Sequence, residues 1–293
     1  MADSEHWKGR RVLVTGCTGL LGTAVVRELL ERRAEVVGLV RDRVADGDFQ
    51  RDLRFRQVRL IHGLVEDRFR IQSALAVNEI HCVFHLATPT DDAMLDRGTA
   101  AVLAAVQSHD ARIPVVTAQP QARLGIANVN EAEPAKHCVT WGVAEFGELF
   151  GGGDRKTFRT VPATILANLT GERSPTAMVN GSPRDFVFAP DAARACLMLA
   201  ESLAGSGQPV SSKIVFQTGW RFTDRELAAI LRGMLTGTPA ATPLFSMPPF
   251  NSLGWVPAVS LIEAMRQTID WYREFLQNRF FGTRTAASSR RAA

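Results

Sequence analysis

A glycine-rich loop between a predicted strand and a predicted helix constrains this chain most. Residues 11–16 form a short apolar run that ends in glycine, which predicts a buried strand. From residue 20 to residue 32, leucines and valines recur at helical spacing. Glycines between such elements permit a tight turn and bring backbone close to a pyrophosphate, which the helix N-terminus attracts. We therefore expect a dinucleotide site, with a turn that binds nothing as the alternative. Its residues are Thr15, Gly16, Cys17, Thr18, Gly19, Leu20, Leu21 and Gly22.

Strands alternate with helices along the rest of the chain. Further strands are predicted at residues 35–40, 58–62, 81–87, 113–117, 186–188 and 213–218. Helices are predicted at residues 99–107, 191–203, 225–235 and 260–276. Such alternation indicates an α/β fold, namely a Rossmann-type doubly wound parallel sheet, with a small C-terminal α/β substrate lobe.

Domain boundaries are predicted where the alternation of strands and helices weakens. Residues 1–157 are expected to form the dinucleotide-binding domain, within which residues 118–157 lack clean periodicity and form an altered, shortened segment. Residues 158–281 are expected to be mainly the substrate lobe, with segments that return to the core. The small and basic residues 282–293 are expected to be a disordered tail.

Composition excludes several classes of protein. The 293 residues are 46% hydrophobic and carry a net charge of +4, which is enough apolar material for a core and too small a surplus to indicate a nucleic-acid partner. No apolar run is long enough to cross a bilayer, so no membrane partner is expected. The four cysteines have no metal-ligand spacing, so no metal site is predicted, and they suit a reduced cytoplasmic protein.

The end of the second strand bears on the choice of cofactor. An acidic residue there favours NAD, whereas arginine favours the 2′-phosphate of NADP. Here Arg41 and Asp42 follow Val40, with Arg43 next. We expect NADP to be preferred, with Arg41 on its phosphate, and NAD to be the alternative. Arg41 and Arg43 as a solvated surface pair is the competing interpretation.

Several stretches resemble the extended short-chain dehydrogenase/reductases, and among them the NAD(P)-dependent nucleotide-sugar epimerases and 4,6-dehydratases. The spacing Thr-Gly-x-x-Gly-x-x-Gly in the loop is similar to theirs, and the resemblance covers most of residues 8–276. The other matching stretches are His85-Leu86-Ala87, Arg184-Asp185-Phe186-Val187-Phe188 and Leu253-Gly254-Trp255. The resemblance implies a nucleotide-sugar-like small molecule as partner.

The resemblance also implies roles for single residues. Leu86 and Ala87 would lie beside the cofactor, and Leu64 stands where the family has an aspartate near the adenine. Arg159 and Arg184 would meet the diphosphate of the substrate, a role that suits the guanidinium fork. The alternative for both arginines is an ion pair, with Asp154 or Asp185.

The chain departs from the family in the chemical half of the site. The family carries Tyr-x-x-x-Lys, whose tyrosine exchanges a proton with a substrate hydroxyl. The single tyrosine here, Tyr272, is followed four positions later by Leu276. The nearest analogue is the segment from Trp141 to Glu145; alternatively, the helix that carries the motif is absent, because the region is roughly two dozen residues short.

Other residues could replace the missing pair. His137, Glu145 and Glu148 gather in the altered segment and could act as acid and base, and Asp91 follows the fourth strand. Ordinary loop roles are the competing interpretation for each of them. Two functions therefore stay open: an epimerase- or dehydratase-like enzyme of nucleotide-sugar or specialised-metabolite biosynthesis with non-standard chemistry, and a catalytically inactive subunit. Loss of the motif helix would also alter the family's homodimer face, so a protein partner or an altered homodimer is expected.

Overall fold

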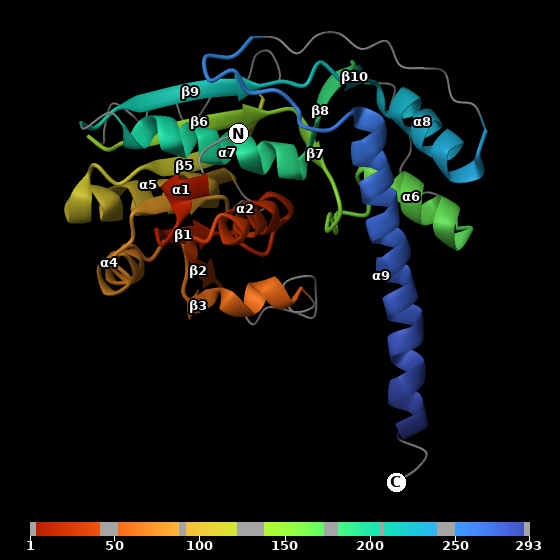
Figure 1. Ribbon diagram of the computed structural model, residues 1–293, viewed down its shortest axis with the longest axis horizontal. Helices are drawn as coiled ribbons and strands as arrows, with labels where there is room; N and C mark the ends of the chain where they lie inside the picture. Colours follow the sequence, from red (N-terminus) through yellow and green to blue (C-terminus); the bar gives the residue numbers. More distant parts are fainter. Residues whose placement is uncertain are drawn as a thin grey trace.

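A seven-stranded sheet forms the centre of the protein, in the order β3-β2-β1-β4-β5-β6-β9, with neighbouring strands parallel (Figure 1). The computed structural model describes residues 4–41, 52–87, 92–121, 138–172, 181–205, 208–238 and 250–289. The strands of this sheet are β1 (Arg11–Thr15), β2 (Glu35–Val40), β3 (Arg59–His62), β4 (Cys82–His85), β5 (Val115–Pro120), β6 (Trp141–Phe146) and β9 (Ser211–Phe216).

The strand order reverses at β1. The chain runs from β1 outward to β3 and then returns to β4 on the other side of β1. Loops at the carboxyl ends of β1 and β4 therefore diverge, and open α/β sheets bind ligands at such a point. The glycine-rich loop follows β1 directly, so the fold sets it at this reversal point.

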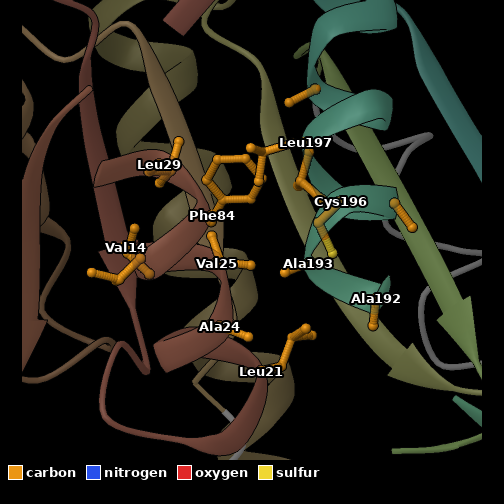
Figure 2. Close-up of a cluster of buried hydrophobic side chains, with 14 of the residues drawn as sticks. Val14, Leu21, Ala24, Val25, Leu29, Phe84, Ala192, Ala193, Cys196 and Leu197 are labelled. Carbon is orange, nitrogen blue, oxygen red and sulfur yellow. The ribbon is translucent and has the colours of Figure 1, made fainter. Parts of the chain in front are cut away.

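Helices cover both faces of the sheet. Helices α2 (Leu20–Glu31) and α7 (Ala189–Ala204) pack together on one face, while α4 (Arg68–Val77) and α5 (Asp92–Asp110) pack together on the other. Figure 2 shows side chains of α2 and α7 meeting over Phe84 of β4. Small residues such as Ala193 on α7 let the two helices approach closely. These contacts fix the first turn of α2 against the sheet.

A smaller lobe has its own sheet and its own apolar core. Its strands are β10 (Arg221–Phe222), β8 (Arg184–Phe188) and β7 (Glu148–Phe150), in that order. Its helices are α6 (Thr160–Thr170), α8 (Asp224–Thr236) and α9 (Leu261–Ser289). Helix α8 begins with a capping box between Thr223 and Glu226. There are also two short helices: α1 (Ser4–Trp7) packs Trp7 against Phe84 of the large sheet, and η1 (Leu53–Gln57) contacts α2.

The predicted fold class is confirmed, and two local predictions differ from the structure. The segment from Trp141 to Glu145 is strand β6, buried at every position, and so it cannot stand in for a helical motif. Alternating contacts with both helical layers explain this, because a central strand of a parallel sheet is apolar on both faces. Helix α9 runs to Ser289, through residues 282–289 that we expected to be a disordered tail.

Candidate functional site

The glycine-rich loop is held by close backbone contacts that only glycine permits. Gly16 has a φ of 67°, and a Cβ there would lie 2.5 Å from the backbone nitrogen of Ala87. A Cβ on Gly22 would lie 2.0 Å from the carbonyl oxygen of Gly16. Gly19 is the N-cap of α2 and supplies no side-chain hydrogen bond to the helix. The first turn of α2 thus lies tightly against the end of β1, with its terminal N–H groups uncapped by any side chain.

Thr15 and His85 link the ends of β1 and β4 beneath this loop. The Thr15 hydroxyl lies 2.7 Å from His85 Nδ1 and accepts a hydrogen bond from the backbone of Ala87 at 3.3 Å. Leu86 donates its backbone N–H to the Thr15 carbonyl. Burial lowers the pKa of His85 to about 4, so the ring is neutral near pH 7. His85 is therefore a packed strand-end side chain rather than a general base.

Cys17 fills space inside the loop. Its side chain is fully buried, and the Cβ of any residue replacing Gly38 would lie 2.9 Å from its sulfur. Burial raises the pKa of the thiol to about 12, which keeps it protonated at neutral pH. In the loop, Leu21 is buried and Thr18 is exposed.

The remaining predicted cofactor residues are only partly described. Arg41 is exposed and directly follows β2, and Leu64 is about half exposed just beyond β3. Both therefore lie at the carboxyl edge of the sheet, on the side of β1 that the second and third strands occupy. Asp42, together with the catalytic candidates Asp91 and His137, lies outside the described residues.

Glu145 is a buried carboxylate within the large sheet. Register places it opposite Gln119 of β5, whose side-chain amide donates to its Oε1 at 2.5 Å. Lys213 of β9 completes the group, with Nζ 2.9 Å from the same oxygen. Trp141, on the same face of β6, donates its indole N–H to Thr117 at 3.0 Å. The structure thus brings Glu145 together with Gln119 and Lys213, neither of which was predicted as a site residue.

Glu148 lies at the start of β7, on a cavity of about 280 Å³ in the small lobe. Arg159 and Arg184, the two predicted substrate ligands, line the same cavity. Arg159 pairs with Asp154, as the competing interpretation held, and also with Glu148. Arg184 pairs with Glu148 and Asp224, and not with Asp185.

Asp185 and Tyr272 have structural partners instead. The Asp185 carboxylate accepts hydrogen bonds from the backbones of Thr218 and Gly219, although burial raises its pKa. Tyr272 is 2% exposed and donates its hydroxyl to the carbonyl of Asp154 at 2.5 Å. The single phenol of the chain therefore ties α9 to the small lobe.

Sequence reasoning missed the far wall of the cavity. Asp224 and Phe158 line it, and the Thr160 hydroxyl donates to Asp224. Asp224 lies 40 residues from Arg184 along the chain, so no local pattern joins them. The one available signal was its place directly before the predicted helix 225–235, where a carboxylate is also expected for helix capping alone.

Among the described residues, no helix is both long enough and apolar enough to span a membrane. Within the same ranges, no group of three or more histidine, cysteine, aspartate or glutamate side chains is placed to hold a metal ion.

Comparisons with known sequences match the first part of the chain. Residues 12–109 match the model of the NAD dependent epimerase/dehydratase family. GDP-L-fucose synthase 1 of Arabidopsis thaliana is 31% identical over 125 residues, which cover 39% of this chain and 37% of that protein. Putative GDP-L-fucose synthase 2 of the same plant is 31% identical over 107 residues, 32% of this chain and 31% of that protein. The matches thus span only about a third of these curated relatives.

Comparisons with solved structures match nearly the whole chain. UDP-glucose 4-epimerase of Thermotoga maritima, solved with UDP-glucose, has a TM-score of 0.69 at 19% identity, covering 91% of this chain and 99% of that one. The Bordetella bronchiseptica enzyme WbmF, solved with NAD+ and UDP, has a TM-score of 0.70 at 20% identity, covering 98% and 99%. These likenesses establish the fold. Residues 12–109 are thus similar to the NAD dependent epimerase/dehydratase family, and the described residues share the fold of these two solved enzymes.

Proposed function

We propose that this protein binds a nicotinamide dinucleotide, NADP in preference to NAD, on the loop from Thr15 to Gly22. The observation that carries the proposal is the backbone fit of Gly16 and Gly22, which sets the uncapped first turn of α2 at the reversal point of the sheet. A pyrophosphate would accept hydrogen bonds from N–H groups there and gain from the helix dipole. The B. bronchiseptica relative by fold was solved with NAD+.

Other residues at the same edge would hold the rest of the cofactor. Arg41, at the end of β2, would contact the 2′-phosphate of NADP, with Asp42 beside it. Leu64 would lie near the adenine, and Leu86 and Ala87 at the end of β4 would flank the dinucleotide. The bound nicotinamide would supply a hydride acceptor or donor.

Any chemistry here must proceed without a tyrosine acid/base. Tyr272 is in the core of the small lobe with its hydroxyl bound to a carbonyl, and no other tyrosine exists in the sequence. Among the described residues, Glu145 with Lys213 is the group at the carboxyl ends of the strands that could hold a proton. We therefore favour a nucleotide-sugar-like or specialised-metabolite enzyme with non-standard catalytic residues, in which Glu145 is the candidate acid or base.

A catalytically inactive, nucleotide-binding subunit is the second candidate. Its supporting observation is the pairing of charged side chains in the small-lobe cavity, where Arg159 and Arg184 both contact Glu148. Arginines already paired with carboxylates of the chain have fewer donors left for the phosphates of a nucleotide-sugar. Such a subunit would act through a protein partner or an altered homodimer.

Cofactor binding and preference are tested by titrating NADPH and NADH against the purified protein, with nucleotide fluorescence as the readout. We expect Arg41→Ala to weaken NADPH binding at least about tenfold and to leave NADH binding unchanged, because one charge-assisted contact is lost. Arg112→Ala is the matched control, since Arg112 is exposed and paired with Asp110 far from the loop. Arg41→Ala that binds NADPH as tightly as wild type does would remove Arg41 from the proposed 2′-phosphate contact, and wild type that binds NADH as tightly as NADPH would overturn the NADP preference.

Catalysis is tested separately, by incubating the NADP-loaded protein with nucleotide-hexoses and, in parallel, with uncharged glycosides, and following product by mass spectrometry. Glu145→Gln should abolish any turnover while preserving NADPH affinity. Turnover that survives Glu145→Gln would remove this residue from the proposed chemistry. Activity that appears only with a partner protein would support the inactive-subunit candidate.

A further inference from the structure

The charged side chains of the small-lobe cavity form one continuous chain of ion pairs. Asp154 Oδ2 lies 3.4 Å from a terminal nitrogen of Arg159, whose Nε lies 3.5 Å from Glu148 Oε1. The other oxygen of Glu148 lies 3.4 Å from Arg184, which also pairs with Asp224. Glu148 is thus the central member, because it contacts both arginines.

The cavity wall carries more negative than positive charge. Its titratable lining is three carboxylates and two guanidiniums, and every arginine in it has two carboxylate partners. Arg184 is held further by the ring of Phe186, 5.6 Å from its guanidinium carbon. A nucleoside diphosphate would have to displace Glu148 from both arginines and then face the carboxylates of Asp154 and Asp224. That exchange would break the two ion pairs of Glu148 and bring the phosphates close to carboxylates of the same charge.

The size and the apolar part of the lining favour a smaller ligand. A cavity of about 280 Å³ is at the lower limit of ligand pockets, which suits a single ring rather than a nucleotide joined to a sugar. Phe158 is 68% exposed and lines the cavity together with Val161, so an apolar ring face has surfaces to lie against. The carboxylates of the lining can accept hydrogen bonds from ligand hydroxyl groups, and the guanidiniums can donate hydrogen bonds to the same hydroxyl groups.

We propose that this cavity binds a phosphate-free, hydroxylated ring of single-sugar size, and that Glu148 determines this selectivity by occupying Arg159 and Arg184. Glu148 is a specificity residue in this account and not an acid or base. The inference deepens the proposed function, because it names the substrate class of an enzyme that binds its dinucleotide elsewhere. It also explains why a carboxylate at this position is compatible with two neighbouring arginines.

The test is a calorimetric titration with two probes, UDP-glucose and methyl α-glucopyranoside, each with NADP already saturating so that the nucleotide site is filled. Wild type should bind the uncharged glucoside more tightly than UDP-glucose. Glu148→Gln keeps the shape of the side chain but removes its charge, so it should raise the affinity for UDP-glucose at least about tenfold. Glu172→Gln is the matched control, since Glu172 is exposed and outside the cavity.

A second variant separates charge release from a general change of shape. The double variant Glu148→Gln with Arg159→Gln should lose the gained affinity for UDP-glucose, because one freed guanidinium is gone. If Glu148→Gln does not fold, as judged by thermal melting, Arg159→Gln alone serves as the test. This variant should bind UDP-glucose as weakly as wild type does, because the charge of Arg159 is already neutralised by Asp154 and Glu148.

The outcomes that overturn this inference are distinct from failure of the cofactor proposal. Wild type that binds UDP-glucose as tightly as Glu148→Gln does, or that binds neither probe in any variant, would contradict it. NADP binding is measured in the same samples. Failure of NADP to bind, with the probe selectivity still inverted by Glu148→Gln, would refute the cofactor site and leave the cavity assignment standing.

Discussion

At the residue scale, the glycine-rich loop depends on backbone contacts more than on side chains. The Cβ positions of Gly16 and Gly22 are already occupied by backbone atoms of the loop or of the end of β4. A side chain at Gly16 would require the backbone of Leu86 and Ala87 to move, and one at Gly22 would require α2 to move away from the loop. The same packing that fits a dinucleotide site is thus needed for the fold, so stability and binding must be measured separately.

Gly22→Ala should lower both the stability of the fold and the affinity for NADPH. Its Cβ would meet the Gly16 carbonyl oxygen, so we expect a loss of about 1–3 kcal/mol in the free energy of unfolding and weaker NADPH binding. Urea denaturation and NADPH titration provide the measurements. Gly205→Ala is the control, because its nearest neighbour would be 3.9 Å away, and it should change stability by less than about 0.5 kcal/mol. Equal stability of the two variants would contradict the packing argument.

His85 makes stability depend on pH. Its pKa falls from 6.5 in the unfolded chain to about 4 in the native state, because burial disfavours the charged ring. Below pH 6.5 the unfolded chain binds a proton that the native chain does not. The free energy of unfolding should therefore fall as pH drops from 6.5 to about 4, by about 3 kcal/mol over that window, and be independent of His85 above it.

Replacement of His85 by asparagine should remove that part of the pH dependence. Chemical denaturation of His85→Asn at several pH values between 4 and 7 gives the comparison with wild type. His109→Gln is the control, because His109 is exposed and should leave the slope unchanged. A slope that is the same in His85→Asn and wild type would show that the buried ring does not titrate as described.

At the element scale, strand β6 lies within the altered segment, residues 118–157, and joins the large sheet. It runs parallel to both β5 and β9 and is buried along its whole length. Glu145 is tolerated in it because Lys213 and Gln119 supply hydrogen-bond donors from the two neighbouring strands. This arrangement exists only in a sheet, since it needs one partner on each side.

Lys213→Met should therefore destabilise the sheet by about 1–2 kcal/mol, because a buried carboxylate loses a donor. Thermal or urea denaturation measures the loss. Lys8→Met is the control, since the pair of Lys8 with Glu5 is on the surface and should contribute under about 0.5 kcal/mol. If the two variants were equally stable, Glu145 would not depend on Lys213, and the strand register would be in question.

The sequence allowed prediction of the elements that have a clear period and not of those that depend on distant partners. Residues 20–32 and 191–203 show helical spacing, and in the structure they correspond to helices α2 and α7, respectively. Residues 141–146 mix tryptophan, glycine and glutamate, and only the neighbouring strands make them extended. The glycine loop could be placed from its own residues. The cavity could not, because Glu148, Arg184 and Asp224 meet only after folding.

At the scale of the whole molecule, the glycine-rich loop and the small-lobe cavity are carried by two separate cores. The loop lies on the large sheet, whereas the cavity lies among β7, β8 and the first turns of α6 and α8. Figure 1 shows α9 running beside α6 within the small lobe. The hydroxyl of Tyr272 on α9 and the indole of Trp255, which donates to the Asp191 carbonyl, join segments far apart in the chain.

Ligand-dependent melting should reflect this division. NADP should raise the melting temperature of wild type in a concentration-dependent manner, since a ligand that binds only the native state stabilises it. UDP-glucose at the same concentration should have a smaller effect in wild type than in Glu148→Gln. Differential scanning fluorimetry with both variants gives the readout. Equal stabilisation of wild type and Glu148→Gln by UDP-glucose would contradict the assigned role of Glu148.

Native mass spectrometry should decide whether the loop from Thr15 to Gly22 binds a dinucleotide, using protein purified without added nucleotide and the same protein after addition of NADP or NAD. We expect a mass increment of one dinucleotide per chain, with higher occupancy for NADP than for NAD, and the same spectrum gives the subunit count. A chain that stays free of nucleotide with both cofactors would refute the proposed site, because the loop would then be only part of a scaffold.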